Sequence, residues 1–296
     1  MLALGDEVRH DDAVLLRPIG RGDFADVGHF LHAHLNRRLS PADWAAAMEP
    51  SWTNVGPNHG FMLLQGGRVV GAQLAFYSER DSQNGLMRFC NVAALCVLPA
   101  YRAHSLRLLR ALLSQPGYSF TDLSPSGNVR PLNLRLGFQV LDTTTALVVN
   151  AFAAIAPRSM QLTADDSVIA AIFCGPGYKV FGDHREALGA HHLLLTDGAR
   201  QCHIIYRRDR RKNLPLFATI LHVSDPDLFA RGRGEVFRHL LLHHAILFTL
   251  MELRLVRHRP RLSMLLRGHR PKMFRSTELG ADAIDYLYSE LTCVAW

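Results

Sequence analysis

The chain has 296 residues, enough for one large domain or two ordinary ones, and its 48% hydrophobic and 20% charged residues indicate a globular protein with a substantial core. Its five cysteines lack CxxC spacing, which argues against a disulfide-rich secreted protein and favours reduced cysteines in a cytoplasmic one. An acidic start argues against a signal peptide, and no apolar run reaches the roughly 18 to 20 residues that span a bilayer, so we expect no contact with membranes.

Positive charge is concentrated in the second half of the chain. The formal net charge is +7, and the residues after Asn150 carry 20 Lys and Arg against 14 Asp and Glu. Three interpretations remain open: a solvated basic face, a surface that attracts the phosphates of a ligand, and a nucleic-acid-binding surface.

The first half predicts alternating strands and helices. Asp23 and Ser40 are expected to cap two helices, and Gly66-Gly67 is expected at the tip of a hairpin. The predicted strands are 13–19, 61–64, 69–77, 92–98, 118–123 and 143–150, and the helix after the fourth strand is 106–113.

A basic turn joins the strand at 92–98 to the following helix. Free N–H groups and the dipole at a helix start bind phosphate, so this order is suited to an anion. The turn resembles V-x-P-x-Y-R-x-x-G-x-G, the acyl-CoA pyrophosphate loop of the GNAT superfamily of N-acetyltransferases. Serine and arginine replace its two glycines. The resemblance implies acetyl-CoA or another acyl-CoA as co-substrate, held by Val97, Tyr101, Arg102, His104, Ser105 and Arg107.

Gly137-Phe138 is similar to the end of the GNAT motif that follows. The family places a tyrosine four residues before this glycine, as the acid that protonates the departing thiolate; here Asn133 stands there. An amide can orient a group but cannot supply that proton. Either the thiolate leaves as the anion or the first domain has lost the chemistry.

The second half repeats the same order faintly, after a connector at 150–162. We expect a hairpin of strands 191–195 and 202–207, a fourth strand at 216–223 and an apolar helix that ends near Phe248. Further expected elements are a helix at 165–173, a strand at 251–256, a helix at 261–267 and an aromatic-rich strand at 283–296.

A second phosphate loop is expected in this half, between the strand at 216–223 and its helix. Arg231, Gly232, Arg233 and Gly234 resemble R-x-x-G-x-G/A more closely than the first loop does, so they are the first choice for the cofactor. GNAT folds hold the thioester carbonyl against an amide of the fourth strand, here near 95–97 or 221–223. Neither strand carries the frequent glutamate base. The nearest titratable groups are His222 and Asp225 in the second half, and His104 and Asp122 in the first; the candidate catalytic residues are His222, Asp225 and Asn133.

The resemblance predicts an α/β fold with two GNAT-like domains, residues 1–150 and 151–296, each a mixed, mostly antiparallel twisted sheet flanked by helices. The expected activity is acyl transfer, most simply acetyl transfer, to a primary amine of a small molecule or peptide. Two alternatives remain: a GNAT-fold transferase that takes its acyl group from aminoacyl-tRNA, and a non-catalytic scaffold. Metal binding is not expected, because His239 and His243 lack an HExxH pattern. The sequence leaves the oligomeric state open.

Overall fold

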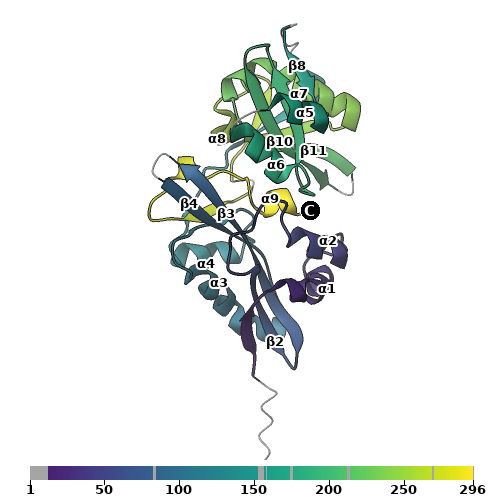
Figure 1. Ribbon diagram of the computed structural model, residues 1–296. Coiled ribbons are helices and arrows are strands. Elements are labelled where there is room, and N and C mark those ends of the chain that lie inside the picture. The colour runs from purple at the N-terminus through teal and green to yellow at the C-terminus, as the bar shows by residue number, and fades with distance from the viewer. Residues whose placement is uncertain are drawn as a thin grey trace, which may run out of the picture.

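The computed structural model describes residues 13–82, 85–152, 157, 159–173, 176–211, 214–268 and 270–295 (Figure 1). The strands in these residues form two seven-stranded sheets, one in each half of the molecule. Both sheets are mixed and mostly antiparallel, and helices pack against them, which confirms the predicted fold class.

The first sheet has helices on both faces (Figure 1). α1 (Phe24–His34) and α2 (Pro41–Ala47) lie on one side, and α3 (Ser105–Leu113) and α4 (Val129–Arg135) lie on the other. Ser40 caps α2 through its hydroxyl as predicted, accepting from the Asp43 amide at 3.1 Å. The strands contributed by this half are β1 (Leu15–Pro18), β2 (Gly60–Gln65), β3 (Arg68–Ser82), β4 (Gly85–Val97), β5 (Ser119–Asp122) and β6 (Gln139–Val140).

The second half follows the same plan. Its helices are α5 (Asp166–Ile172), α6 (Pro176–His184), α7 (Pro226–His244) and the short α8 (Leu253–Val256), and its strands are β8 (Gln161–Thr163), β9 (His191–Thr196), β10 (Gln201–Arg211), β11 (Leu214–Val223), β12 (Phe248–Glu252) and β13 (Ser263–Leu266). Alternate residues of β9 face opposite helices: Leu195 packs in the core beneath α7, and Leu194 packs with Phe181 of α6.

Each half contributes its last strand to the other half's sheet. β7 (Thr145–Val149) runs antiparallel between β12 and β13 in the second sheet. β14 (Met273–Arg275) runs antiparallel between β5 and β6 in the first. A boundary between residues 150 and 151 therefore does not separate the two sheets, because β7 lies before it in sequence and β14 after it.

The C-terminal segment corrects three sequence expectations. Residues 261–267 contain strand β13 instead of a helix, because their short apolar run pairs with β7. The expected strand at 251–256 is the end of β12 followed by α8. The expected strand at 283–296 is a 3₁₀ turn, a loop and the short helix α9 (Glu290–Cys293). Such short apolar runs do not distinguish strand from buried helix by their periodicity.

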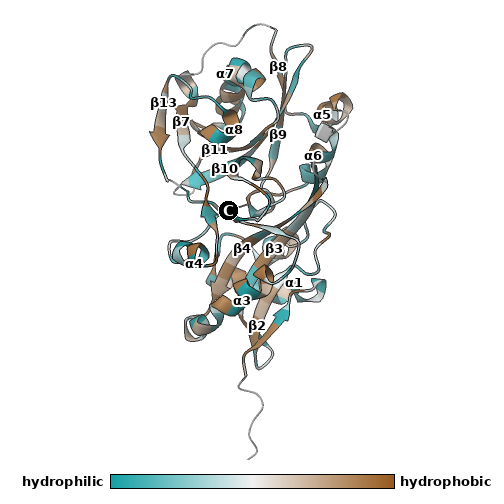
Figure 2. Cartoon of the chain, turned by 90° about the vertical axis from the view of Figure 1, so that its left-hand side faces the viewer, coloured by the Kyte–Doolittle hydropathy of each residue, from teal (hydrophilic) through white to brown (hydrophobic). Residues whose placement is uncertain are grey.

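This segment forms a shared core with both halves, and Figure 1 shows it, in yellow, between them. Tyr288 packs edge-on against Trp52 of the first half and His184 of the second, with ring centroids 5.2 and 4.5 Å apart. Arg80 of β3 forms an ion pair with Asp285 and donates to the Leu287 carbonyl at 2.8 Å. Figure 2 shows the hydrophobic stretches of β3 and β4 that reach toward this core. The two halves are thus held together by packing as well as by the exchanged strands.

Candidate functional site

Two neighbouring parallel strands of the first sheet separate part-way along their length. β4 and β5 pair only from Phe89–Asn91 against Ser119–Thr121. Beyond this point β4 stays with β3, while β5 leads toward α4. The residues on each side of the separation line the same cavity.

A β-bulge accentuates the separation. Ala93 and Cys96 of β4 stand opposite Leu74 and Ala72 of β3, so β4 has one extra residue there. Ala94 lies in the left-handed region with φ 51°, which a non-glycine residue rarely adopts. β11 of the second half has a similar register shift, between the pairs Ile205–His222 and Tyr206–Ile220.

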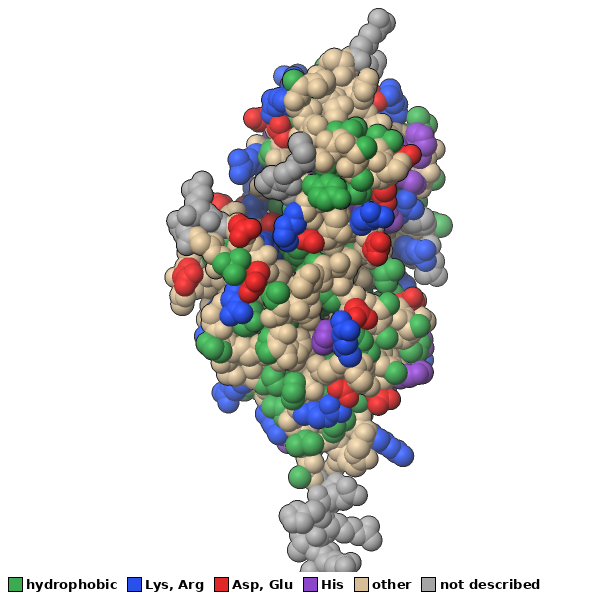
Figure 3. Space-filling model, in the orientation of Figure 1, with side chains coloured by type: hydrophobic (Ala, Val, Ile, Leu, Met, Phe, Trp, Pro, Cys, Tyr) green, Lys and Arg blue, Asp and Glu red, His purple; other side chains and the backbone are tan. Residues whose placement is uncertain are grey.

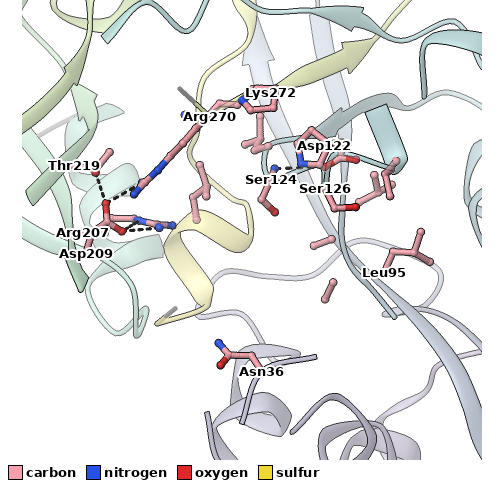
Figure 4. A pocket seen from close by; sticks show the side chains of 18 of the residues that line it. Asn36, Leu95, Asp122, Ser124, Ser126, Arg207, Asp209, Thr219, Arg270 and Lys272 are labelled. Atoms are coloured by element: carbon pink, nitrogen blue, oxygen red, sulfur yellow. Dashed lines mark hydrogen bonds and ion pairs between the residues drawn. The ribbon is translucent and has the colours of Figure 1, made fainter. Parts of the chain in front are cut away.

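A cavity of about 670 Å³ lies between the two sheets (Figure 4). Ala94, Leu95 and residues 122–126 form its first-half wall. Strands β10, β11 and β12 and residues 270–272 form the wall on the second-half side. At this size the cavity falls within the range of small-molecule binding sites.

Asp122, at the end of β5, is a carboxylate of the first-half wall. Its carboxylate accepts a hydrogen bond from the Asn133 side-chain amide at 2.7 Å and one from the Ser124 amide at 3.4 Å. Burial raises the pKa of Asp122 to about 6, against the lowering effect of these hydrogen bonds. The group is therefore mostly ionised at neutral pH but takes up a proton readily.

Glu290, from the C-terminal segment, lies behind this wall. Ser124 Oγ donates to its Oε1 at 3.0 Å, and its backbone amide donates to the Asn91 side chain at 2.9 Å. Burial, together with the charge of Asp122, raises the pKa of Glu290 to about 8. At neutral pH Glu290 is therefore mostly protonated beside an ionised Asp122.

The second-half wall is built from ion pairs. Asp209 binds Arg207 at 2.6 Å and Arg270 at 2.9 Å, and the Thr219 hydroxyl also donates to it. Burial alone would raise the pKa of Asp209, but the charges of Arg207 and Arg270 outweigh it and hold the pKa below its usual value. A second ion pair in this wall joins Lys272 to Glu252 at 2.6 Å.

No protein-family model and no curated protein matches the sequence. Solved structures do match: GCN5-related N-acetyltransferases from Anabaena variabilis (12% identity, TM-score 0.58, 89% of this chain and 72% of that one) and Kribbella flavida (16%, 0.58, 92% and 73%). A proposed acetyltransferase from Pyrococcus horikoshii matches over 96% of both chains, at 12% identity and a TM-score of 0.56.

The chain has the GNAT fold.

The predicted phosphate loop of the first half is a 3₁₀ turn, Pro99–His104, which continues directly into α3. The Tyr101 amide donates to the Leu98 carbonyl at 2.9 Å, and the Ser105 amide donates to Arg102. The Tyr101 hydroxyl donates to Gln65, and the Ser105 hydroxyl to the Arg102 carbonyl at 2.8 Å. These donors therefore already have acceptors within the protein.

The other residues of this loop surround the same turn. Arg102 is exposed, and Val97, at the end of β4, is half-buried. Arg107 does not fill the cleft: its guanidinium contacts the Val14 carbonyl at 3.1 Å and His104 Nδ1 at 3.2 Å. Among the described residues the first turns here carry no acid, so the charge suits an anion. Binding of a cofactor by these residues remains a prediction.

The predicted loop of the second half is not a loop. α7 begins at Pro226, so Arg231, Gly232, Arg233 and Gly234 lie in the helix interior. A Cβ at Gly232 would lie 2.5 Å from Leu195 Cδ2, so this glycine permits α7 to pack closely on β9. Arg231 pairs with Asp197, and Arg233 donates to the Ala230 carbonyl. The expectation that these residues open the helix is wrong.

Asp225 occupies the actual start of α7. Its carboxylate caps the helix by accepting from the Leu228 amide at 2.9 Å, and it pairs with Arg200. Burial tends to raise the pKa of Asp225, but the hydrogen bonds from Arg200 and Leu228 keep it below its usual value. With Asp227 also in the first turn, this helix start repels phosphate.

His222 lies outside the cavity lining. Its ring lies edge-on to that of His203, 5.9 Å away, and His203 Nε2 contacts His192 Nδ1 at 2.9 Å. Burial lowers the pKa of His222 and of His192, and lowers that of His203 to about 2. His222 therefore belongs to a cluster of largely buried, neutral histidines outside the cavity lining, and its catalytic role remains a prediction.

Asn133 is fully buried and reaches the site only through Asp122. This fits the expectation that an amide in this position orients a neighbouring group, although no proton donation follows from it. Within the described residues no group of three or more His, Cys, Asp or Glu is placed to hold a metal. His239 and His243 stack on each other, with ring centroids 4.5 Å apart.

Sequence reasoning missed three residues of the cavity region: Glu290, Arg207 and Arg270. The i, i+2 spacing of Arg207 and Asp209 could have shown that they share one face of a strand. Nothing in the sequence places Glu290 beside Ser124, 166 residues earlier. No helix in the described residues is both long and apolar enough to cross a membrane.

Proposed function

We propose that the protein is an acyl-CoA-dependent N-acyltransferase that binds its acyl donor in the first half. The supporting observation is the bulged, separated β4 and β5, whose residues 92–95 and 122–126 line the cavity between the halves. The shared fold supports this proposal, because the resemblance to the GNAT family leads us to expect the thioester beside the fourth strand.

Charge favours the first half over the second as the donor site. The turn before α3 carries Arg102 and His104 without an acid, whereas α7 begins with Asp225 and Asp227. CoA carries several negatively charged phosphates. A carboxylate at the helix cap would occupy the free amides and would also repel these phosphates. This reverses the order expected from the glycine pattern.

Asp122 is the proposed general base. The unprotonated amine of the acceptor attacks the thioester carbonyl, the C–N bond forms, and the proton lost by nitrogen passes to the Asp122 carboxylate. The C–S bond then breaks and the CoA thiolate leaves as the anion, which takes a proton from solvent; Asp122 releases its proton to solvent, and the products are the amide and free CoA. A pKa of about 6 suits a base that works near neutral pH. Asn133 holds this carboxylate, and Glu290 behind it retains its own proton.

Binding of CoA tests the donor site directly. At 100 times the dissociation constant, acetyl-CoA should stabilise the protein by about 2.7 kcal/mol, measured by thermal unfolding. Arg102→Glu should weaken binding by about tenfold, because it reverses a charge beside the helix start. Arg110→Glu, an equally exposed position at the other end of α3, is the matched control and should bind normally.

One observation favours a second function, transfer from aminoacyl-tRNA. The 3₁₀ turn satisfies the Tyr101 and Ser105 amides internally, which leaves fewer donors for a pyrophosphate. On the face shown in Figure 3, however, Lys and Arg alternate with Asp and Glu instead of forming one basic surface. Absence of CoA binding together with salt-sensitive tRNA binding would replace the first proposal by this one. Absence of both would leave a non-catalytic scaffold.

A further inference from the structure

The second-half wall of the cavity carries more positive than negative charge. Two guanidinium groups, those of Arg207 and Arg270, share the single carboxylate of Asp209. Glu252 does not reduce this surplus, because it pairs with Lys272. The Arg207–Arg270 pair therefore keeps about one uncompensated positive charge at the cavity wall.

Asp209 has little capacity left for either cation. One carboxylate oxygen accepts from Arg207 Nε at 2.8 Å, and the other accepts from Arg270 at 2.9 Å and from the Thr219 hydroxyl. Each guanidinium has five N–H donors in a fixed fork. One carboxylate therefore cannot accept hydrogen bonds from all the donors of two guanidinium groups. Donors remain for a further acceptor.

One such donor group is buried. Arg207 NH1 has no solvent contact and no hydrogen-bond partner among the described residues. The side chain as a whole is 12% exposed, and a buried charged group without its hydrogen bonds costs free energy. An anion in the cavity would add the negative charge that Arg207 lacks, while it accepts hydrogen bonds from Arg270, whose side chain is 33% exposed.

The general base faces the cavity from the other side. Figure 4 shows Asp122 and Ser124 on one wall and Arg207, Asp209 and Arg270 on the opposite wall, with the cavity between them. A ligand whose amine lies at Asp122 would extend toward the guanidinium pair.

We propose that the acceptor is a small primary amine that also bears an anionic group, a carboxylate or a phosphate, which Arg207 and Arg270 bind. This inference rests on the proposed N-acyltransfer, since it names the acceptor of that reaction. Arg207 and Arg270 act as binding residues that orient the acceptor, and they take no proton from it. Guanidinium groups suit this role because they bind carboxylate and phosphate through paired hydrogen bonds.

Matched acceptors test the anionic group. We would measure acetyl transfer to L-lysine against L-lysinamide and to O-phosphoethanolamine against ethanolamine. The anionic member of at least one pair should react with about tenfold higher kcat/KM or more, since one charge-assisted contact is worth roughly that factor. The pair that shows this preference distinguishes a carboxylate from a phosphate.

A variant links the preference to the wall. Arg270→Gln should raise KM for the preferred anionic acceptor by about tenfold, with little change for its neutral analogue. Arg267→Gln removes an equal charge from an exposed position three residues earlier, outside the cavity lining, and should change neither. Arg270→Lys, which keeps the charge but not the fork, should restore part of the loss.

Equal rates for anionic and neutral acceptors, or equal effects of Arg270→Gln on both, would overturn the anionic acceptor while leaving N-acyltransfer intact. A binding arm without donor separates the two proposals: thermal stabilisation of the wild-type protein by these anionic amines, lost in Arg270→Gln. Stabilisation without any acyl transfer or CoA binding would support the anion site and refute the proposed reaction. If neither anionic amine stabilises the protein or reacts better than its neutral partner, the inference fails.

Discussion

Asp122 has a raised pKa because its polar partners offset only part of the cost of burial. It receives hydrogen bonds from Asn133 and Ser124, but no cation contacts it among the ion pairs of the described residues. Asp209, in the same cavity, is also buried but has two arginines, and its pKa is lowered. Two carboxylates on facing walls thus differ in protonation: Asp122 takes up a proton readily, as the proposed base must, whereas Asp209 stays ionised beside its two arginines.

Replacement of Asp122 by Asn should lower kcat by about 10²- to 10⁴-fold, because the amide cannot accept the proton from the amine. In the wild type, kcat/KM should rise with pH more steeply below about pH 6 than above it, because Asp122 ionises there while deprotonation of the acceptor amine contributes throughout. The change of slope near pH 6 should disappear in the variant. Steady-state kinetics between pH 5 and 8 measure both effects.

Asp142→Asn, at an exposed position, is the control and should leave the pH profile unchanged. Unaltered CoA binding in Asp122→Asn would show that the site remains folded. A variant with full activity would exclude Asp122 as the base.

The buried histidines should make the stability of the folded protein depend on pH. Burial lowers the pKa of His184 to about 4 and that of His203 to about 2, so between these values and 6.5 the unfolded chain binds more protons than the folded one. Stability should therefore be lost as the pH falls below 6.5, by about 1–2 kcal/mol for each histidine at pH 5. Urea unfolding at pH 7 and pH 5 measures this difference in the free energy of unfolding.

Asp122 and Glu290, whose pKa values are raised, act in the other direction over this range. A His203→Leu variant isolates the histidine contribution: its stability should depend less on pH than that of the wild type. An identical dependence would mean that His203 is protonated in the folded state.

At the scale of elements, sequence patterns predicted the hairpin, the fourth strand and the apolar helix of each half, because alternation and helix periodicity reflect burial directly. They failed for α7. Gly232 and Gly234 resembled a phosphate loop, yet Asp225-Pro226, six residues before Gly232, already supplied the cap and first-turn proline of a helix. A glycine in the sequence is compatible with a turn or with a helix that packs closely on its neighbour. Only the contact of Gly232 with β9 shows that the second explanation holds here.

Gly232→Ala should destabilise the protein. The new Cβ would meet the buried Leu195 side chain at 2.5 Å, and this overpacking, typically about 1–3 kcal/mol, should exceed the gain in helix propensity of about 1 kcal/mol. Gly182→Ala, in α6, is the matched control: nothing lies within 4 Å, so it should stabilise by about 0.5–1 kcal/mol. Urea unfolding of both variants gives the comparison; equal effects would contradict the packing role.

At the scale of the whole molecule, the tandem organisation was predictable and the exchange of last strands was not. Both halves carry the strand order of one plan, which the repeated sequence pattern showed. The partner of β7 or β14, however, is fixed by pairing at the edges of β12 and β5, and no pattern within a strand specifies which sheet it joins. The same non-local pairing brings Glu290 and Arg270 to the cavity.

Neither half should fold alone. A fragment of residues 1–150 lacks β14 and leaves β7 without its neighbours, so it should expose unpaired strand edges and aggregate or remain partly unfolded. The fragment of residues 151–296 lacks β7. Circular dichroism and calorimetry should show no cooperative transition in either fragment but one in the intact chain.

Co-expression of the two fragments is the positive control and should recover a folded complex. A cooperative transition in the isolated first fragment would show that the exchanged strand is dispensable.

The exchanged strand β14 also determines when the first sheet can be completed during synthesis of the chain. The first half leaves the ribosome early, but β5 and β6 must wait for residues 273–275, and Ser124 must wait for Glu290. A nascent chain therefore carries an unfinished cleft until residues 273–290 have been synthesised. Premature termination anywhere before β14 would yield no partly active product.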